Sequence, residues 1–385
     1  MSTVVDAPAG ARPKAKKPWP VIDCDAHPTP NSLDVLAPYL SKGWQKRLNI
    51  GEGRLGAGQF AIWRLPSGPF FNPHGGIRTD AIPPDGGFGG SDPKFMAKQL
   101  FDDHEIDYSI CTVNHALFAG TLSNPSLATT LMSAFNDYFV AEWLTQDKRF
   151  LGSIHVAPQD PMAAAREIRR LADHPQMVQI FVPTYAIRLG KNYFDPIWDA
   201  AQETGLPVAW HPGSESAGVN AGFTAGGWAS TYVENYSTSI SHVAQANLVS
   251  VITEGVFEKF PRARFVLIEG GVTWIVAVLW RLRRAWIANR DEIPWMTRPP
   301  EEYVKDYIRI STQPLEEPSG DLRDLHTVLN TVHADEFLMY ASDYPHWDFD
   351  NPKAALRAFP ADWQRKIMYD NPRAFYPKVA GLFAA

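Results

Sequence analysis

The fold class is decided by the stretch that runs from residue 150 to residue 211, FLGSIHVAPQDPMAAAREIRRLADHPQMVQIFVPTYAIRLGKNYFDPIWDAAQETGLPVAWH. Three of its runs are short and apolar or β-branched, and we predict them to be strands: Phe150–His155, Met177–Phe181 and Pro207–His211. The two segments between them, Pro161–His174 and Phe194–Thr204, have the length of helices. Short strands that alternate with helices are typical of a parallel sheet covered by helices.

The same alternation continues on both sides of this stretch. Five more runs are predicted to be strands: Val21–Asp25, Tyr108–Thr112, Phe265–Glu269, Ile308–Thr312 and Phe337–Ser342. Further helices are predicted over Val243–Phe260 and Leu322–His333. Eight repeats of a strand followed by a helix predict an α/β fold whose strands close into a (β/α)₈ TIM barrel.

The length of 385 residues fits one large barrel or two ordinary domains, so composition alone does not choose between them. The eight repeats favour a single metal-dependent barrel domain over residues 19–385, preceded by a flexible N-terminal arm at 1–18. Segments rich in Gly and Pro at about 51–92 and 212–236 interrupt the rhythm. We predict that both are insertions on the barrel rim, and that the first is a lid or a subunit contact.

Charge and hydropathy indicate the kind of partner. A net charge of -6 without a long basic run argues against a nucleic-acid surface. The longest apolar run, Val272 to Trp280, is too short to span a bilayer. No apolar run of the kind that follows the basic residues of a secretory signal is present near the start. We therefore expect a cytoplasmic protein that binds a small-molecule substrate, with no nucleic-acid or membrane partner.

Apolar surface beyond the needs of the barrel predicts an assembly. The helix expected over Val272–Ala288 carries apolar residues around more of its circumference than one barrel-facing stripe requires. The insertion at 51–92 adds large apolar residues, among them Phe60, Ile62, Trp63, Phe70, Phe71 and Phe88. Exposed apolar patches of this kind usually mark an interface. We expect a homo-oligomer, or a hetero-oligomer with a paralogous subunit.

Barrel enzymes carry their reactive side chains at the C-terminal ends of the strands. Asp25 and His27 follow the first predicted strand, His211 ends the fifth, and Asp343 follows the eighth. Side chains two residues apart on a strand share a face, so Asp25 and His27 can bind one ion. Carboxylate and imidazole are common ligands of divalent cations, and a bound cation can acidify a water molecule. We predict a metal site formed by Asp25, His27, His211 and Asp343.

Other polar residues near strand ends have more than one interpretation. Glu269 ends the sixth strand and can serve the site or cap the next helix, and Asp343 can likewise begin a helix. His346 can be a ligand or an exposed rim residue. We interpret His115, His155 and His242 as structural more readily than as ligands, and Asp23 as a partner that supports the ligands.

Several motifs resemble a known family. They are Asp-Cys-Asp-Ala-His-Pro (23–28), Trp-His-Pro-Gly (210–213), Glu-Gly-Val-Phe-Glu-Lys-Phe-Pro (254–261), Thr-Gln-Pro-Leu-Glu-Glu-Pro (312–318) and Ser-Asp-Tyr-Pro-His-Trp-Asp-Phe-Asp (342–350). Across residues 20 to 377 the chain resembles the amidohydrolase-related group of the amidohydrolase superfamily. Members of that group are barrel hydrolases and non-oxidative decarboxylases that bind zinc or manganese. The resemblance implies that Asp25, His27, His211 and Asp343 hold the metal.

Two residues depart from the decarboxylases of this group. The first ligand is Asp25 rather than His, and Glu269 stands where those decarboxylases carry a catalytic His. Additional carboxylates favour iron or manganese over zinc and allow a second ion. The opening motif and Ser-Asp-Tyr-Pro-His-Trp are similar to a small branch of dinuclear metal oxygenases that includes the 2-aminoisobutyric acid hydroxylase subunits and a diterpenoid hydroxylase.

Three functional hypotheses follow. The favoured one is a dinuclear iron monooxygenase that hydroxylates a small carboxylate-bearing substrate, with Glu269 and His346 as catalytic residues that complete the second metal site. The first alternative is a hydrolase or non-oxidative decarboxylase of a small carboxylic acid with one ion, in which Glu269 is the general base. The second alternative is a subunit whose metal is structural and which supports an active paralogue. Iron is the favoured divalent metal, with manganese or zinc as alternatives.

Overall fold

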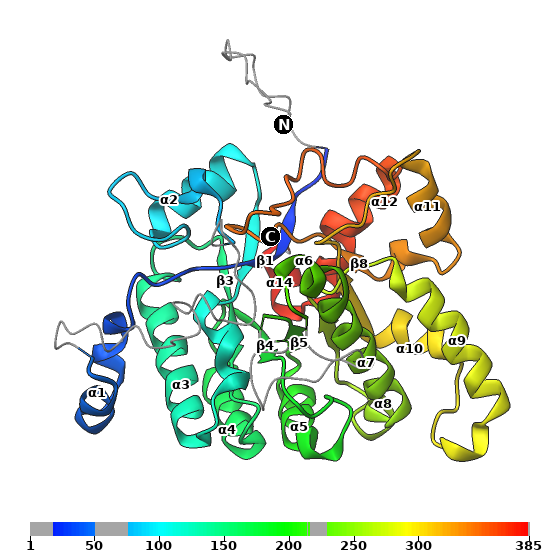
Figure 1. Cartoon of the computed structure of the whole chain (residues 1–385), viewed down its shortest axis with the longest axis horizontal. Helices are drawn as coiled ribbons and strands as arrows, with labels where there is room; N and C mark the ends of the chain where they lie inside the picture. Colours follow the sequence, from blue (N-terminus) through cyan, green and yellow to red (C-terminus); the bar gives the residue numbers. More distant parts are fainter. Residues whose placement is uncertain (1–17, 51–75, 214, 216–228, 384–385) are drawn as a thin grey trace, which may run out of the picture.

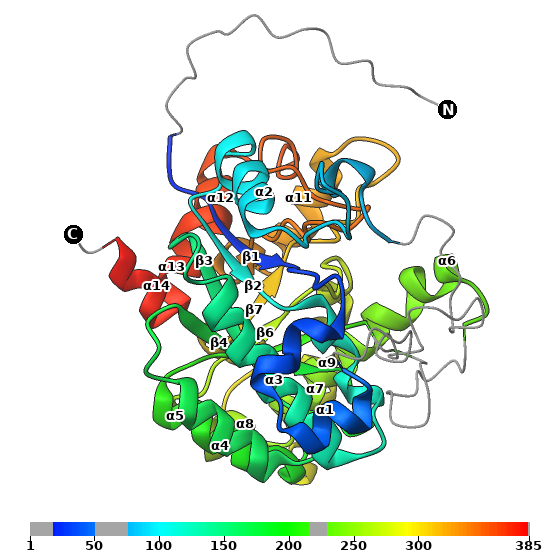
Figure 2. The same ribbon diagram turned by 90° about the vertical axis from the view of Figure 1, so that its left-hand side faces the viewer.

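The computed structural model describes residues 18–50, 76–213, 215 and 229–383. In this part of the chain eight strands pair in parallel and in sequential order, which confirms the predicted α/β barrel (Figures 1 and 2). The strands are β1 (Ile22–Ala26), β2 (Tyr108–Cys111), β3 (Phe150–His155), β4 (Met177–Pro183), β5 (Val208–His211), β6 (Phe265–Leu267), β7 (Ile308–Ser311) and β8 (Leu338–Met339).

Backbone hydrogen bonds connect the last strand region to the first. The N–H of Cys24 donates to the carbonyl of Tyr340 at 2.9 Å, and the N–H of Asp343 donates to the carbonyl of Asp25 at 3.0 Å. The N–H of His27 donates to the carbonyl of Tyr344 at 2.6 Å. These hydrogen bonds between the regions of β8 and β1 place the backbone of Asp343 beside that of Asp25. The neighbouring residue Ser342 is 317 positions from Asp25 in sequence, and its hydroxyl donates to the carbonyl of Asp25.

Helices surround the strands on the outside of the barrel (Figures 1 and 2). The longer ones are α3 (Pro125–Glu142), α4 (Pro161–Leu171), α5 (Asp195–Thr204), α7 (Ile240–Thr253), α9 (Trp274–Ala288), α10 (Pro300–Tyr307) and α11 (Arg323–Asn330). Shorter α-helices are α1 (Lys42–Leu48), α2 (Pro93–Ala97), α6 (Tyr232–Glu234), α8 (Val256–Lys259), α12 (Ala361–Arg365), α13 (Asn371–Phe375) and α14 (Pro377–Leu382). Local sequence sets their ends: Asp160 caps α4 by accepting from the N–H of Ala163 at 2.9 Å.

Several predicted boundaries differ from the structure. The single helix predicted over Val243–Phe260 is two helices, α7 and α8, because Gly255 between them adopts a left-handed φ of 71°. The sixth strand ends at Leu267 and not at Glu269, and the eighth has only two residues. Beyond these two strands, Glu269 and Asp343 have positive φ angles and so lie outside the extended conformation.

The C-terminal helices close the end of the barrel where the strands begin. Phe375, Tyr376 and Val379 pack in one buried cluster with residues from seven of the strands, such as Ile110 and Val266. The ammonium of Lys378 donates to the carbonyl of Met177, the first residue of β4, at 2.8 Å. The helices α13 and α14 therefore cover the end of the barrel where the strands begin, opposite to the end where the strands finish.

The described parts of the two insertions lie against the loop that follows β8. The N–H of Arg78 donates to the carbonyl of Pro345 at 2.9 Å, and Ile77 forms an antiparallel bridge with His346. In the second insertion, residues 232–239 form α6 and the π-helix η7 (Asn235–Ser239). The predicted arm, apart from Pro18, and residues 51–75, 214 and 216–228 of the insertions lie outside the described residues.

The expected assembly stays a prediction, and α9 carries the surface on which it rests. Trp280 and Ile287 are 58% and 60% exposed, whereas Leu282 and Trp286 are buried. Of the aromatic residues expected in the first insertion, Phe88 is described and is exposed. Among the described residues, no helix combines the length and the apolar character that crossing a membrane requires.

Candidate metal centre

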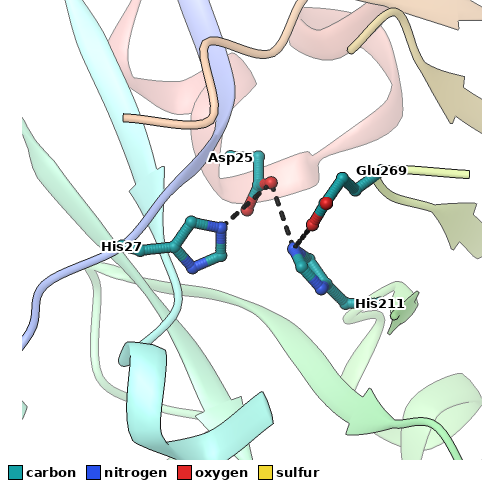
Figure 3. Close-up of side chains that lie close together, drawn as sticks. All are labelled: Asp25, His27, His211 and Glu269. Atoms are coloured by element: carbon teal, nitrogen blue, oxygen red, sulfur yellow. Dashed lines mark hydrogen bonds and ion pairs between the residues drawn. The ribbon is translucent and has the colours of Figure 1, made fainter. Parts of the chain in front are cut away.

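Side chains from three strands meet at the C-terminal end of the barrel (Figure 3). Asp25 lies in β1, and its Oδ2 is 3.3 Å from Nε2 of His27, which stands just beyond that strand. The same Oδ2 is 3.2 Å from Nε2 of His211 at the end of β5. Nε2 of His211 is also 3.2 Å from Oε2 of Glu269, which follows β6. These four side chains form one group of potential metal ligands.

A second group shares two members with the first. Oδ1 of Asp343 is 3.1 Å from Nε2 of His27 and 2.6 Å from Nδ1 of His346. One donor atom from each of His27, Glu269, Asp343 and His346 lies within 4.8 Å of the others. The structure therefore brings together all six residues that the sequence indicated as ligands or catalytic groups.

Backbone carbonyls orient the two histidines of the first group. Nδ1 of His27 is 3.2 Å from the carbonyl of Thr112, and Nδ1 of His211 is 2.8 Å from the carbonyl of Pro212. A carbonyl only accepts, so each Nδ1 carries a proton and each Nε2 faces the carboxylates. A metal-binding histidine needs this arrangement, because its second nitrogen must be held by an outer partner.

The carboxylates attract positive charge to the centre. Burial raises the pKa of Glu269 well above its ordinary value, and the charges of Asp343 and Asp348 raise it further. Burial would also raise the pKa of Asp25, but His27 and His211 outweigh it and lower that pKa. Burial would lower the pKa of His27, but Asp25 and Asp343 raise it well above its usual range. A proton or a divalent cation can supply the charge that this cluster favours.

The donor set fits a divalent cation. Oδ1 of Asp25 is buried and has no hydrogen-bond partner among the described residues, although buried polar atoms are almost always satisfied. The ion pairs of Asp25, Asp343 and Glu269 within the described residues are all made with histidines. Imidazole nitrogens combined with carboxylate oxygens suit zinc, manganese and iron. The centre therefore fits a divalent metal.

Two ligand candidates are held in an unfavourable backbone conformation. Glu269 has a φ of 52° and Asp343 a φ of 57°, both in the left-handed region that residues with a side chain rarely adopt. The N–H of Glu269 is fixed by the hydroxyl of Ser311 at 2.9 Å, and that of Asp343 by the carbonyl of Asp25 at 3.0 Å. Strain of this kind concentrates at functional residues, where the surrounding structure maintains it.

The alternative structural roles of these two residues are not observed. The N–H groups of Val272 and Thr273, just before α9, donate to Glu316 at 3.0 and 3.1 Å, so Glu316 and not Glu269 accepts from the backbone there. Residues 345–350, which follow Asp343, contain no helix. Neither Glu269 nor Asp343 is therefore explained as a helix cap.

The remaining histidines that the structure describes lie outside both ligand groups. Nε2 of His155 accepts from the N–H of Val113 at 2.9 Å, and its Nδ1 is 2.7 Å from Oδ1 of Asn136. Burial lowers the pKa of His155 to about 3 and that of His115 to about 4, so both are neutral. His242 is exposed on α7. The structural interpretation of His155 is thus supported by its two hydrogen bonds.

Asp23 supports the ligands as expected, through the backbone. Its Oδ1 accepts from the N–H of Asp25 at 3.2 Å and from the N–H of Ser342 at 2.7 Å. Its Oδ2 accepts from the hydroxyls of Ser109 and Ser342 at 2.8 and 2.7 Å. Burial raises the pKa of Asp23 to about 7, and these hydrogen bonds oppose the rise. One buried carboxyl group therefore ties together the chain segments that carry Asp25 and Asp343.

Residues that the sequence did not single out also approach the centre. Oδ2 of Asp348 accepts from Nε2 of Gln313 at 2.9 Å and from the hydroxyl of Tyr236 at 2.8 Å. Glu215 is buried beyond β5 and accepts from the N–H of Gly213 at 2.9 Å. Asp348 lies within the 342–350 motif, so the motif offered a signal for it. Tyr236 and Glu215 lie in the Gly-rich stretch of the sequence that was predicted as the second insertion, where no motif offered such a signal.

Comparisons with known proteins agree with this architecture. Residues 22–378 match the family model described as Amidohydrolase. Gamma-resorcylate decarboxylase of Polaromonas sp. (strain JS666 / ATCC BAA-500) is 23% identical over 282 residues, which cover 69% of this chain and 78% of the relative. The structure of 5-carboxyvanillate decarboxylase from Novosphingobium aromaticivorans, complexed with manganese, superposes with a TM-score of 0.64 at 18% identity and covers 94% of this chain and 97% of that one.

A further solved structure, an amidohydrolase from Mycobacterium avium subsp. paratuberculosis, has a TM-score of 0.66 at 20% identity and covers 94% of this chain and 98% of its own. The curated relatives are decarboxylases, so they agree with the decarboxylase alternative and not with the hydroxylase hypothesis. Manganese, and not iron, is the metal of the 5-carboxyvanillate decarboxylase structure. The family match runs from the first barrel strand into the last helix, and six ligand-type side chains meet at the strand ends. The chain is therefore an enzyme that belongs to the amidohydrolase family.

Proposed function

We propose that the protein is a metal-dependent carboxy-lyase that removes the carboxylate of a small organic acid as CO₂ without oxidation. The observation that carries the proposal is the position of the Glu269 carboxyl group, which lies 3.2 Å from His211 inside a buried group of cation-binding side chains. The decarboxylase relatives support the same class of reaction.

Asp25, His27, His211 and Asp343 would hold a divalent cation. Such an ion supplies Lewis-acid chemistry, because it polarises the oxygen atoms of a bound carboxylate. Manganese is the ion we favour, since the 5-carboxyvanillate decarboxylase structure contains it. The four residues also exclude bulk water from the reacting groups, because their side chains are buried.

Glu269 would deliver the proton that decarboxylation requires. When the bond between the carboxylate and its neighbouring carbon breaks, CO₂ leaves and the electron pair stays on that carbon, which then takes up a proton. Burial and the nearby charges of Asp343 and Asp348 raise the pKa of Glu269, so its carboxyl group holds a proton more readily than an exposed glutamate does. Glu269 then recovers a proton from solvent before the next turnover.

A second candidate function is a two-ion oxygenase. It is favoured by one observation, the overlap of the two ligand groups at His27 and Glu269. Glu269, Asp343 and His346 would then hold a second ion, and the ion pair would supply the redox chemistry that an oxygenase requires. In this case Glu269 would be a ligand and would not act as a proton donor.

Two measurements separate these candidates. Metal-free protein is loaded with manganese or with iron and incubated with gamma-resorcylate and 5-carboxyvanillate, with and without oxygen, while CO₂ release and oxygen consumption are followed. The carboxy-lyase releases CO₂ without oxygen. Oxygen-dependent turnover with two iron ions per chain would instead support the oxygenase.

The role of Glu269 is tested with Glu269→Gln, which keeps the shape and removes the transferable proton. We expect its turnover to fall by about 100-fold or more, as for the loss of a general acid. Glu316→Gln is the matched control, because Glu316 also follows a strand but accepts from the backbone N–H of Val272 and lies outside both ligand groups. Full CO₂ release by Glu269→Gln would refute the proton-donor role.

A further inference from the structure

A chain of hydrogen bonds connects the helical rim segment to the ligand candidate Asp343. The hydroxyl of Tyr236 in η7 donates to Oδ2 of Asp348 at 2.8 Å. Nε2 of Gln313 donates to the same Oδ2 at 2.9 Å and to Oδ2 of Asp343 at 3.0 Å. Gln313 and Asp343 are fully buried, so water competes little with these contacts.

The two carboxylates fix the orientation of the Gln313 amide. An amide nitrogen carries two hydrogen atoms, and the carboxylate oxygens of Asp343 and Asp348 accept one each. Rotating the amide by 180° would place its oxygen against two acceptors. Asp348 therefore selects the orientation in which Gln313 donates to Asp343, and Tyr236 holds Asp348 in place.

This contact divides the two oxygens of Asp343 between different partners. Oδ2 is occupied by the Gln313 amide, whereas Oδ1 is 3.1 Å from Nε2 of His27 and 2.6 Å from Nδ1 of His346. Oδ1 thus lies beside two other potential ligand atoms. The geometry of Asp343 is therefore suited to bind a cation through one oxygen.

We propose that Gln313, oriented by Asp348 and Tyr236, is a positioning residue that reserves Oδ2 of Asp343 and confines this ligand to coordination through Oδ1. The inference rests on the metal centre of the proposed function but not on its reaction. It connects the segment after β5 to metal binding through named contacts, so a change at Tyr236 alters the affinity of the centre for its ion.

If Tyr236 only packed the rim segment against the loop after β8, then removing another hydrogen bond between these segments would have the same effect on metal binding. Tyr232 provides the matched control. Tyr232 lies one helical turn before Tyr236, and the centroids of the two rings are 5.8 Å apart. The indole N–H of Trp347 donates to the hydroxyl of Tyr232 at 3.0 Å. Tyr232→Phe therefore removes a hydrogen bond between the same two segments without touching the chain that ends on Asp343.

The test is a titration of metal-free protein with Mn²⁺ alone, in which free Mn²⁺ is measured by electron paramagnetic resonance. We expect Gln313→Met to weaken Mn²⁺ binding by about tenfold or more, as for other residues that orient metal ligands. Tyr236→Phe should weaken it about threefold, since one hydrogen bond further from the ligand is lost. Tyr232→Phe should bind Mn²⁺ like the parent protein.

The absorption spectrum of the Co²⁺-substituted protein gives a second readout that packing alone would leave unchanged. It should shift in Gln313→Met and Tyr236→Phe but not in Tyr232→Phe. Equal Mn²⁺ affinities and identical spectra for the two tyrosine variants would overturn the inference, even if Gln313→Met does not fold. Because no substrate is present, the result is independent of whether the protein releases CO₂.

Discussion

Gly90 is the position at which we expect a single methyl group to disturb the metal centre. Its φ of 75° is left-handed, and a Cβ atom added there would lie 2.8 Å from the backbone carbonyl oxygen of His27 and 3.0 Å from Cγ of Pro345. The carbonyl of Gly90 accepts from the N–H of Thr29 at 2.8 Å, so this turn is fixed against the segment that carries His27. Gly90→Ala therefore forces either the turn or His27 to move.

The magnitude has two parts that a control separates. A left-handed conformation costs an alanine about 1–2 kcal/mol. The contact with His27 adds about 1–3 kcal/mol, the usual cost of overpacking against atoms that cannot rotate away. Gly86 has a similar φ of 88°, but a Cβ atom there would meet nothing within 4 Å. Gly86→Ala therefore carries the conformational cost alone.

The assay is urea unfolding of the parent protein and the two variants, together with Mn²⁺ titration. We expect Gly90→Ala to lose more stability than Gly86→Ala and to bind Mn²⁺ more weakly, whereas Gly86→Ala should keep the parent affinity. If the two variants lose the same stability and both bind Mn²⁺ like the parent protein, then the turn at Gly90 does not position His27.

Two further predictions concern Asp23 and the surface of α9. The folded-state pKa of Asp23 is about 7, against an ordinary value of 3.8. The proton on Asp23 therefore stabilises the metal-free protein fully below about pH 4, and this stabilisation is lost as the pH rises to about 7. Asp23→Asn should therefore become more stable relative to the parent protein between pH 5 and pH 8 in urea unfolding, and a difference that does not change with pH would contradict this. For the assembly, Trp280→Glu should dissociate the protein at low micromolar concentration in light scattering, because Trp280 is 58% exposed, and a parent protein that is already monomeric would count against an interface on this helix.

The barrel and the grouping of the ligand candidates were predictable because both follow from local rules. Short apolar runs such as Met177–Phe181 alternate with helical segments, and this alternation is enough to indicate parallel strands. The rule that polar residues at strand ends gather at one mouth then selects His211 and Glu269, which lie 58 residues apart but within 3.2 Å of each other. The positive φ angles of Glu269 and Asp343 were not predictable, because they depend on contacts with distant chain segments.

The supporting contacts were hidden for the same reason. Tyr236 and Asp348 are 112 residues apart and Gln313 and Asp343 are 30 apart, so no local pattern links them. His155 and His211 both end strands and look alike in sequence. They differ only because the N–H of Val113 and the amide of Asn136 occupy the nitrogens of His155, whereas Nε2 of His211 faces Asp25.

The position of the C-terminal helices bears on substrate access and on which parts of the chain can vary. Since α13 and α14 pack against the starts of the strands, the substrate and product of the proposed reaction would enter and leave at the opposite end, where the ligand groups lie. Residues that cover the starts of the strands, such as Phe375 and Tyr376, take no part in the ligand groups. The sequence of the rim segments can therefore change to fit an acid of another shape, while the packing of α13 and α14 against the strands is kept.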